Sequence, residues 1–284
     1  MNGVLVLDKP ANMSSAAAVD RVKRALGADR AGHGGTLDPI ATGVLAICVG
    51  EATKLAPYLL ADDKAYEADA ILGIATDTLD RTGAVTQTQP YDGVTRDAIE
   101  RALAGRRGEQ EQVPPMFSAI KRGGVPLYKQ ARRGVEVDRE PRRVRIDRLE
   151  LLAFDVPRVR LAIACSKGTY VRSLVADLGE DLGCGAHLGE LRRTRSGRFS
   201  LADAVPLDAV APERIIPMNA VLGLPAVTVP GELVPTIKNG IQHPLERLGA
   251  PAGAQFQLLD ETRRLLAIAH DEGGRVVYDR VFGS

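Results

Sequence analysis

Residues 31–43 read AGHGGTLDPIATG and place one carboxylate, Asp38, in a segment rich in glycine and closed by proline. Glycine permits backbone conformations that other residues resist, and Pro39 pushes the residue before it toward an extended conformation. Asp38 is therefore expected to project from a rigid, irregular loop, where catalytic groups often lie. The alternative is an Asx-type turn, because Asp before Pro often starts one. These residues alone do not decide between a turn and a catalyst.

The rest of the chain predicts short strands and amphipathic helices, followed by a small β module. The strongest helix is 171–182, where apolar residues recur at helical spacing and Gly183 ends the pattern. After residue 204 prolines recur, and we place a domain boundary near residues 215–225. The other expected helices run from Ser14 or Ser15 to about Leu26, over 52–60 and over 95–103. The expected strands are 4–7, 44–49, 66–74, 149–154 and 159–165, and then 256–259, 265–269 and 275–278 in the module.

Composition sets broad limits on the class of protein. The chain has 284 residues, is 45% hydrophobic and has a net charge of +1, which is ordinary for a globular protein. Its three cysteines are widely spaced, which argues against a disulfide framework and for a reducing compartment. Cys184 and His187 stand three apart, but no second close pair completes a site, so no metal is expected. No apolar stretch approaches the roughly 20 residues of a membrane span, and we expect a cytoplasmic protein without membrane contact.

Positive charge is concentrated in two places. Residues 121–148 contain ten Lys or Arg against four acids, and a second basic run spans 192–198. Two such clusters in a nearly neutral chain are typical of a surface that follows phosphates, although a solvated face is the alternative. Gly123 and Gly124 favour a mobile basic loop in the first cluster.

Several common catalytic motifs are missing. The sequence has no P-loop, and its one partial GxGxxG pattern has Leu188 where the third glycine should stand. Residues 118–121 match SxxK but lack the companion motifs of serine acyl enzymes. The four histidines form no recognisable catalytic triad. Nucleotide-binding and acyl-enzyme functions are therefore not supported.

Four local features remain: the Asp38 loop, Tyr66 at the opening of a strand, Arg172 in the first turn of the strong helix, and the step 188–193 into the basic run. Each has an ordinary alternative, such as an edge tyrosine or a surface arginine. The helix dipole does not favour an arginine in the first turn. Pairing with a buried carboxylate would give Arg172 a reason to be there.

Together these features resemble the bacterial tRNA pseudouridine-55 synthases, the TruB family, over about residues 2–200. Many short motifs occur in the family's order and spacing, which makes the resemblance specific. They are LDKP at 7–10, AGHGGTLDP at 31–39, GEATK at 50–54, KAY at 64–66, TDT at 76–78, PPMFSA at 114–119, KGTYVR at 167–172, GAHL at 185–188 and LRR at 191–193.

The resemblance implies an α+β fold. It predicts a catalytic domain with a central mixed, mainly antiparallel sheet over residues 1–215, including a basic T-arm-binding insertion at about 121–148. A small PUA-like β domain would follow over residues 220–284.

The resemblance also implies an isomerase that converts uridine 55 in the T-arm loop of tRNA to pseudouridine without a cofactor or a metal. Asp38 would be the catalytic aspartate, attacking C1′ or C6 or acting as a base in a glycal path. Tyr66 would stack on the flipped base and could help to remove the C5 proton, and Arg172 would keep Asp38 ionised and aimed. The base that removes the C5 proton is left open. The RNA-binding or pocket-lining residues would be Lys9, His33, Gly35, Thr36, Lys64, Tyr170, Leu191, Arg132 and Arg143.

Transfer RNA is then the expected partner, and no obligate protein partner is expected. Three other functions are considered. A non-catalytic RNA-binding protein of this fold could spare Asp38. A nucleoside hydrolase or glycosidase would need a second carboxylate in a comparable setting, and none is obvious. A guide-RNA-dependent synthase tends to carry basic extensions, which this chain lacks.

Overall fold

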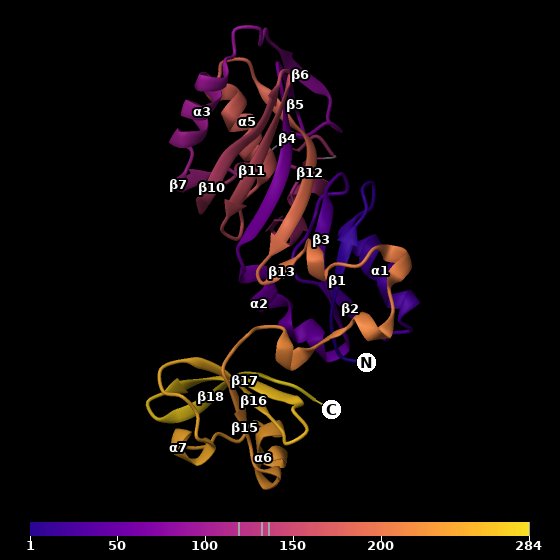
Figure 1. Cartoon of the computed structure of the whole chain (residues 1–284), viewed down its shortest axis with the longest axis vertical. Coiled ribbons are helices and arrows are strands. Elements are labelled where there is room, and N and C mark those ends of the chain that lie inside the picture. The colour runs from indigo at the N-terminus through magenta and orange to yellow at the C-terminus, as the bar shows by residue number, and fades with distance from the viewer. Residues whose placement is uncertain (119, 132, 136, 284) are drawn as a thin grey trace.

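The computed structural model describes residues 1–118, 120–131, 133–135 and 137–283, without the side chains of residues 121 and 126. The molecule is elongated, with a large sheet in its upper and middle parts and a small sheet at the lower end (Figure 1). In the part of the chain described, no helix is long and apolar enough to cross a membrane.

Ten of the described strands form the large sheet. The pairing between β3 and β12 is parallel, whereas its other neighbouring strands pair antiparallel, so the sheet is mixed and mainly antiparallel, as expected. The order is β14 (Ile216–Pro217), β1 (Gly3–Lys9), β3 (Thr42–Val49), β12 (Ala186–Ser196), β4 (Lys64–Leu72), β11 (Arg158–Cys165), β10 (Arg142–Asp155) and β7 (Gly108–Gln112), with β2 (Ala31–His33) beside β3 and β13 (Phe199–Ser200) beside β12.

The parallel contact divides the large sheet into two halves. It consists of two register pairs, Thr42 with Arg192 and Gly43 with Arg193, and we call it the seam. The N-terminal half-sheet contains β14, β1, β3 and β2, and the central half-sheet contains β12, β4, β11, β10 and β7. Gly43 has a φ of 97°, and a Cβ there would lie 2.2 Å from the Arg193 carbonyl oxygen. Glycine therefore permits the close approach of the two strands.

Helices cover one face of the central half-sheet. α5 (Val171–Asp181) packs on β12, and α3 (Arg96–Gly105) packs on β10. Ala68, Ala70 and Leu72 of β4 lie in the apolar core, to which α5 contributes Leu174, Val175 and Leu178. In the N-terminal half, α1 (Ser15–Ala25) begins at its cap Ser14, whose hydroxyl accepts a hydrogen bond from the Ala17 amide.

The expected helix over 52–60 is instead a 3₁₀-helix, η1 (Gly50–Leu55), followed by α2 (Ala56–Ala61). Pro57 lies in the first turn of α2, where its missing amide is tolerated. The remaining short elements are β5 (Ile74–Thr76), β6 (Val85–Thr88), η2 (Leu201–Asp203), η3 (Leu207–Ala209), η4 (Pro212–Arg214) and η5 (Met218–Ala220).

The small sheet has the order β15 (Ala226–Thr228), β16 (Gln255–Leu259), β17 (Leu265–Glu272) and β18 (Arg275–Val281). The sequence predicted the last three strands but not β15. The connections carry η6 (Gly231–Leu233), α6 (Val234–Lys238) and α7 (Leu245–Leu248). Leu259 and Phe282 share an apolar cluster with Val4 and Val44 of the N-terminal half-sheet, so the small sheet packs against it.

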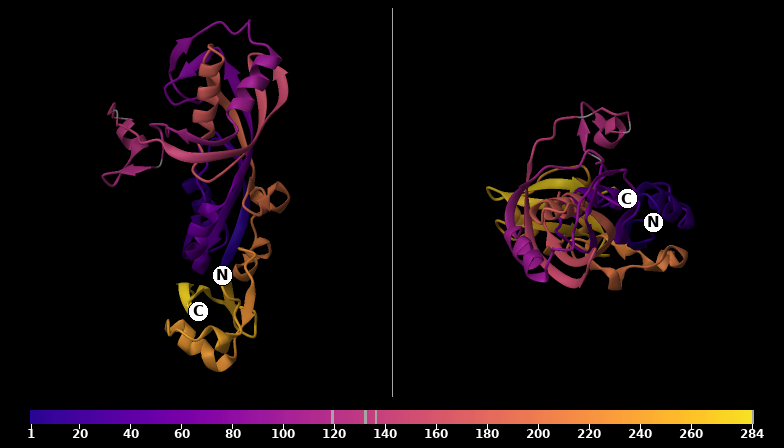
Figure 2. Two further views of the ribbon diagram at one scale, coloured as in Figure 1. Left: turned by 90° about the vertical axis from the view of Figure 1, so that its left-hand side faces the viewer. Right: turned by 90° about the horizontal axis from the view of Figure 1, so that it is seen from above.

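The segment around β8 (Lys121–Arg122), β9 (Val125–Pro126) and α4 (Leu127–Ala131) projects to one side of the body (Figure 2). Residues 142–148, which the sequence placed in the basic insertion, form the beginning of β10 instead. Val144 and Ile146 alternate with exposed arginines there, so one face of this strand joins the core.

Candidate active site

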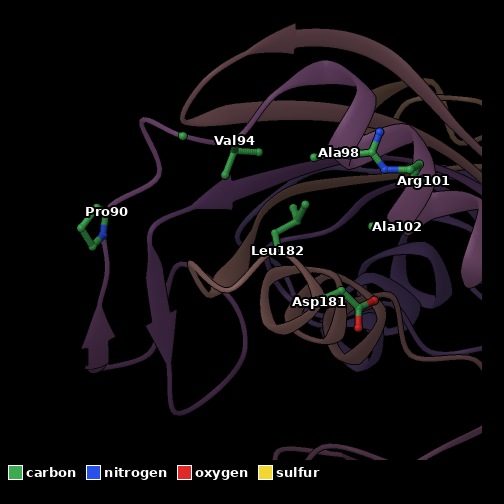
Figure 3. A pocket seen from close by; sticks show the side chains of 8 residues that line it. Pro90, Val94, Ala98, Arg101, Ala102, Asp181 and Leu182 are labelled. Atoms are coloured by element: carbon green, nitrogen blue, oxygen red, sulfur yellow. The ribbon is translucent and has the colours of Figure 1, made fainter.

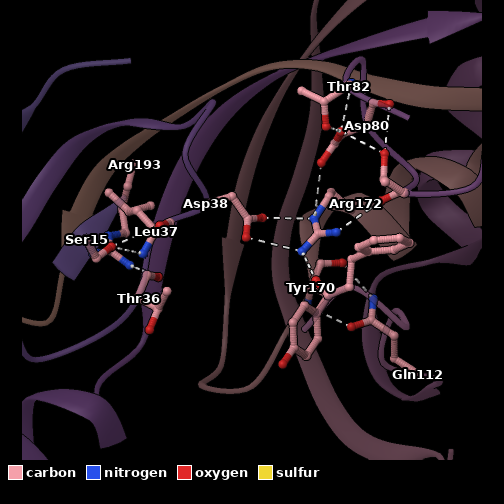
Figure 4. A network of polar contacts seen from close by, with 12 residues as sticks. Ser15, Thr36, Leu37, Asp38, Asp80, Thr82, Gln112, Tyr170, Arg172 and Arg193 are labelled. Carbon is pink, nitrogen blue, oxygen red and sulfur yellow. Dashed lines mark hydrogen bonds and ion pairs between the residues drawn. The ribbon is translucent and has the colours of Figure 1, made fainter. Parts of the chain in front are cut away.

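Asp38 and Arg172 form a bidentate ion pair. Nε of Arg172 donates to Oδ2 of Asp38 at 2.8 Å, and Nη2 donates to Oδ1 at 3.2 Å. Figure 4 shows the carboxylate and the guanidinium facing each other. The side chain of Asp38 is 33% exposed, whereas that of Arg172 is 4% exposed. The buried guanidinium thus fixes the carboxylate on its inner side, and the exposed side of the carboxylate can contact a ligand.

Backbone carbonyls complete the coordination of Arg172. Its Nη1 donates to the Thr78 carbonyl at 3.0 Å, and its Nη2 also donates to the Phe117 carbonyl at 2.8 Å. The guanidinium is therefore fixed from three loops. These contacts explain an arginine in the first turn of α5, which the helix dipole alone does not favour.

Asp80 is a second carboxylate beside the same arginine, and the sequence reasoning missed it. Its Oδ2 lies 3.8 Å from Nε of Arg172, and the side chain is 8% exposed. Its Oδ1 accepts hydrogen bonds from the Thr78 and Thr82 hydroxyls and from the Thr82 amide. The expectation that no second carboxylate shares this setting was wrong. The neighbouring TDT motif at 76–78 was the available signal.

The loop that carries Asp38 is clamped on both sides of the carboxylate. The Ser15 hydroxyl accepts from the Leu37 amide at 2.8 Å and donates to the Leu37 carbonyl at 2.9 Å. Nζ of Lys9 lies 3.4 Å from the Pro39 carbonyl, and the Ala41 amide donates to the Asp38 carbonyl at 3.0 Å. The irregular loop is therefore rigid, as its glycines and proline suggested.

Lys9 and Lys64 do not lie where a phosphate contact needs them. Lys9 is fully buried, and its Nζ also donates to the carbonyls of Pro10 and Met13. Nζ of Lys64 donates to the carbonyls of Leu59 and Leu60 near the end of α2. Burial lowers the pKa of each lysine to about 8, and nearby Asp38 opposes the shift of Lys9. We assign both to support of the site rather than to RNA.

Arg193 corrects the picture of an exposed basic run at 192–198. It is 1% exposed. Its Nε donates to the Val44 carbonyl at 2.7 Å, Nη2 to that of Gly35 at 3.0 Å and Nη1 to that of Thr36 at 3.3 Å. Figure 4 shows Arg193 beside Ser15, Thr36 and Leu37. Arg195, two residues further along β12, is nevertheless exposed, because the register with β4 shifts between Arg193 and Arg195 and interrupts the alternation.

Tyr66 and Leu191 lie close to the seam. Tyr66 pairs in register with Arg193 of β12 and packs against the main apolar cluster, which includes Leu191. Burial raises the pKa of Tyr66, and the charge of Arg193 opposes that shift. The phenol therefore stays protonated at neutral pH.

His33 lies on β2, beside Ile47 of β3. Among the described residues, its buried Nδ1 has no hydrogen-bond partner. Burial and the charge of Arg193 lower the pKa of His33, so its ring is neutral at physiological pH.

The other predicted contact residues are spread over several elements. Tyr170 caps α5 and exchanges two backbone hydrogen bonds with the Gln112 side chain. Gly35 is buried at a φ of 139°, where a side chain would be strained, and Thr36 is exposed. Arg143 is exposed on β10 opposite Glu111. Arg132 lies outside the described residues.

Two further observations limit where chemistry can occur. No group of three His, Cys, Asp or Glu side chains within the described part of the chain could hold a metal ion. A hollow of about 620 Å³ lies between α3 and the end of α5, lined by Val94, Arg101, Asp181 and Leu182 among others (Figure 3). None of the residues assigned above to the Asp38 site lines it.

Comparison with solved structures gives the class of protein. The chain superposes with a TM-score of 0.74 and 27% identity on a chain of "Crystal Structure of a Cbf5-Nop10-Gar1 Complex", covering 98% of this chain and 84% of that one. A chain of "Structure of H/ACA RNP bound to a substrate RNA containing 2'-deoxyuridine" gives 0.73 and 26%, with 99% and 85% covered. The fold is that of the pseudouridine synthases, which are isomerases.

Sequence comparisons give the family. The model described as "TruB family pseudouridylate synthase (N terminal domain)" matches residues 23–171, and "tRNA pseudouridylate synthase B C-terminal domain" matches residues 172–219. The "tRNA pseudouridine synthase B" of Stutzerimonas stutzeri is 44% identical over 100% of this chain and 96% of its own length. That of Pseudomonas fluorescens is 56% identical over 73% of this chain and 68% of its own length. The chain belongs to the TruB family, and it is an isomerase.

Proposed function

We propose that this protein isomerises uridine 55 in the T-arm loop of tRNA to pseudouridine, with Asp38 as the catalytic carboxylate and with the target base flipped out of its stack. The single observation that carries the proposal is the bidentate ion pair between the buried Arg172 and Asp38, whose loop is rigid and leaves the carboxylate accessible. The relatives named tRNA pseudouridine synthase B support tRNA as the substrate. The uridine position and the T arm come from the resemblance of the motifs.

The reaction breaks the bond between N1 and C1′ and forms a bond between C5 and C1′. The C5 proton is released, and N1 is protonated in the product, so the change is an isomerisation. Asp38 would either attack C1′ or C6, or remove a proton on a path through a glycal. In each case the carboxylate must point at the nucleotide, and the two hydrogen bonds from Arg172 fix that orientation.

The neighbouring groups would receive the base and the RNA. Tyr66 would stack on the flipped uracil, and its raised pKa favours this role over that of the base for the C5 proton. Leu191 would pack against the pocket. The unpartnered Nδ1 of His33 offers a hydrogen bond near the vacated stack. Flipping costs a few kcal/mol, which these contacts would repay in part.

The phosphates would meet the outer residues. Thr36 and Arg143 are exposed, and Tyr170 lies beside Arg172. The buried Gly35 would act through the shape of the loop, because its backbone faces Arg193 and Lys64 rather than solvent. Arg132, which lies outside the described residues, stays a predicted RNA contact. Because these basic groups would contact RNA phosphates, the affinity for tRNA would fall as the salt concentration rises.

The decisive experiment maps pseudouridine in an unmodified tRNA treated with the protein, and measures tritium release from uridine labelled at C5. We expect modification at position 55 by the wild type and none by Asp38→Asn, with tRNA affinity within about threefold. The matched control is Asp97→Asn, an exposed position in the first turn of α3. Appreciable turnover by Asp38→Asn would remove Asp38 from the chemistry, and modification elsewhere would overturn the assignment to uridine 55.

A guide-RNA-dependent reaction is the second candidate, because the similar solved structures come from complexes with partner proteins or RNA. The purified protein and a T-arm stem-loop alone distinguish the two. We expect full turnover in that mixture, and dependence on an added guide would refute the stand-alone reaction.

A further inference from the structure

The side chain of Arg193 crosses the seam. Arg193 belongs to β12 in the central half-sheet, but the three carbonyls that it contacts belong to the other half. They are those of Val44 on β3 and of Gly35 and Thr36 in the Asp38 loop. No ion pair among the described residues involves Arg193. The guanidinium also makes a hydrogen bond with the side chain of Tyr66. A buried guanidinium held by neutral groups, without an ion-pair partner, is costly to keep.

The two members of the catalytic pair come from opposite sides of this seam. Asp38 lies between β2 and β3 in the N-terminal half, whereas Arg172 lies on α5, which packs on β12. Two register pairs join the backbones of the halves, and Arg192 of β12 adds an ion pair with Asp8 of β1 at 2.8 Å. The alignment of the carboxylate with its partner therefore depends on how the two half-sheets are held together.

We propose that Arg193 is a positioning residue for the isomerisation. It fixes the peptides two and three residues before Asp38 against the central half-sheet, so that the carboxylate faces Arg172 and the pocket beside Tyr66. Tyr66 is its register partner across β4 and β12, which places that ring on the same side of the sheet. The inference rests on the proposed role of Asp38, and Arg193 itself contacts no substrate.

The geometry of a guanidinium is what this role requires. Its planar fork reaches three carbonyls at once, whereas a lysine ammonium is a compact point charge on a flexible stem. Arg193→Lys therefore keeps the charge but loses the span across the seam. A displacement of about 1 Å at a reacting group can reduce a rate about 100-fold.

The test compares Arg193→Lys and Arg193→Met with the matched control Arg160→Lys. Arg160 forms a bidentate pair with the buried Asp69 of β4, whose side chain alternates with those in the core and points to the opposite face from Tyr66. The control therefore loses a bidentate arginine fork without touching the Asp38 loop, at a side chain that is 46% exposed rather than buried. Single-turnover rates, KM and tRNA affinity would be measured for each variant at the same number of degrees below its own melting temperature.

We expect Arg193→Lys to lower the single-turnover rate about 10- to 100-fold, with KM and tRNA Kd within about twofold of the wild type. Arg160→Lys should lower the melting temperature but keep its rate within about twofold. A rate for Arg193→Lys equal to that of Arg160→Lys would show a structural role alone and overturn the proposal. A loss confined to tRNA affinity would make Arg193 an RNA contact, which also overturns it.

Two combinations of outcomes distinguish a failure of this proposal from a failure of the proposed function. If Asp38→Asn stays active, the assignment of Asp38 fails, whatever Arg193 does. If Asp38→Asn is inactive and Arg193→Lys is fully active, only the positioning role fails. Should Arg193→Met not fold, Arg193→Lys alone decides.

Discussion

Replacing Arg172 by lysine tests the central ion pair directly. The change keeps one positive charge but removes the planar fork that contacts both oxygens of Asp38 and the carbonyls of Thr78 and Phe117. A lysine ammonium can satisfy only part of this set, because its three donors diverge from one atom. The carboxylate of Asp38 should therefore lose its fixed orientation.

The size of the effect follows from the bonds lost. A hydrogen bond to a charged group contributes about 1.5–3 kcal/mol. One of the two bonds to Asp38 is lost outright, and the other weakens, while water reaches the third of Asp38 that is exposed and compensates in part. We expect a net loss of about 2–3 kcal/mol in the transition state, which corresponds to a rate about 30- to 150-fold lower.

The assay is tritium release from a T-arm stem-loop labelled at C5, under single-turnover conditions. Circular dichroism would confirm the fold, and filter binding would give the affinity for the stem-loop, which we expect within about threefold of the wild type. A rate within threefold of the wild type would refute the argument that the fork orients Asp38. An equal loss of rate and affinity would refute the argument that the pair acts on chemistry rather than on binding.

Three other substitutions test the support of the site. Ser15→Ala leaves the buried amide and carbonyl of Leu37 unpaired and should lower the free energy of urea unfolding by about 2–4 kcal/mol. The control Ser14→Ala removes the neighbouring helix cap and should cost about 1 kcal/mol. Equal losses in the two variants would contradict the role of Ser15 in fixing the Asp38 loop. Asp80→Asn should reduce the rate by less than Arg172→Lys does, and a larger loss would show that Asp80 contributes directly. The pKa of Lys9 falls from 10.5 to about 8 on folding, so the unfolded state binds the extra proton and stability should rise with pH across that window. Lys9→Met should reduce the rise seen in urea titrations, and Lys64, whose pKa is also lowered to about 8, should maintain part of it. An unchanged slope would show that Lys9 is not buried.

The sequence predicted much of the local structure and the main elements of the site. The apolar spacing of residues 171–182 predicted α5 to within one residue, because a strong stripe and a terminal glycine act over short distances. The unusual place of Arg172 left a carboxylate partner and a surface arginine open, and the resemblance implied Asp38; the structure shows that pair.

Long-range contacts account for what the sequence could not predict. The burial of Arg193 depends on the pairing of β12 with β3, whose residues lie about 150 positions apart in the chain. Lys9 and Lys64 were expected among the RNA contacts from the resemblance, and their backbone carbonyl partners become visible only in the folded chain. Asp80 lay within a polar turn and carried no periodic signal.

The seam also has a mechanical consequence. Two half-sheets joined by two register pairs can twist against each other more readily than strands joined along their whole length. The separation between Asp38 and Arg172 then reports that twist, so substitutions far from the pocket can change the rate by altering how the halves meet. An RNA that contacts both halves would act as a splint, and the chemistry would be most favourable only while the substrate is bound.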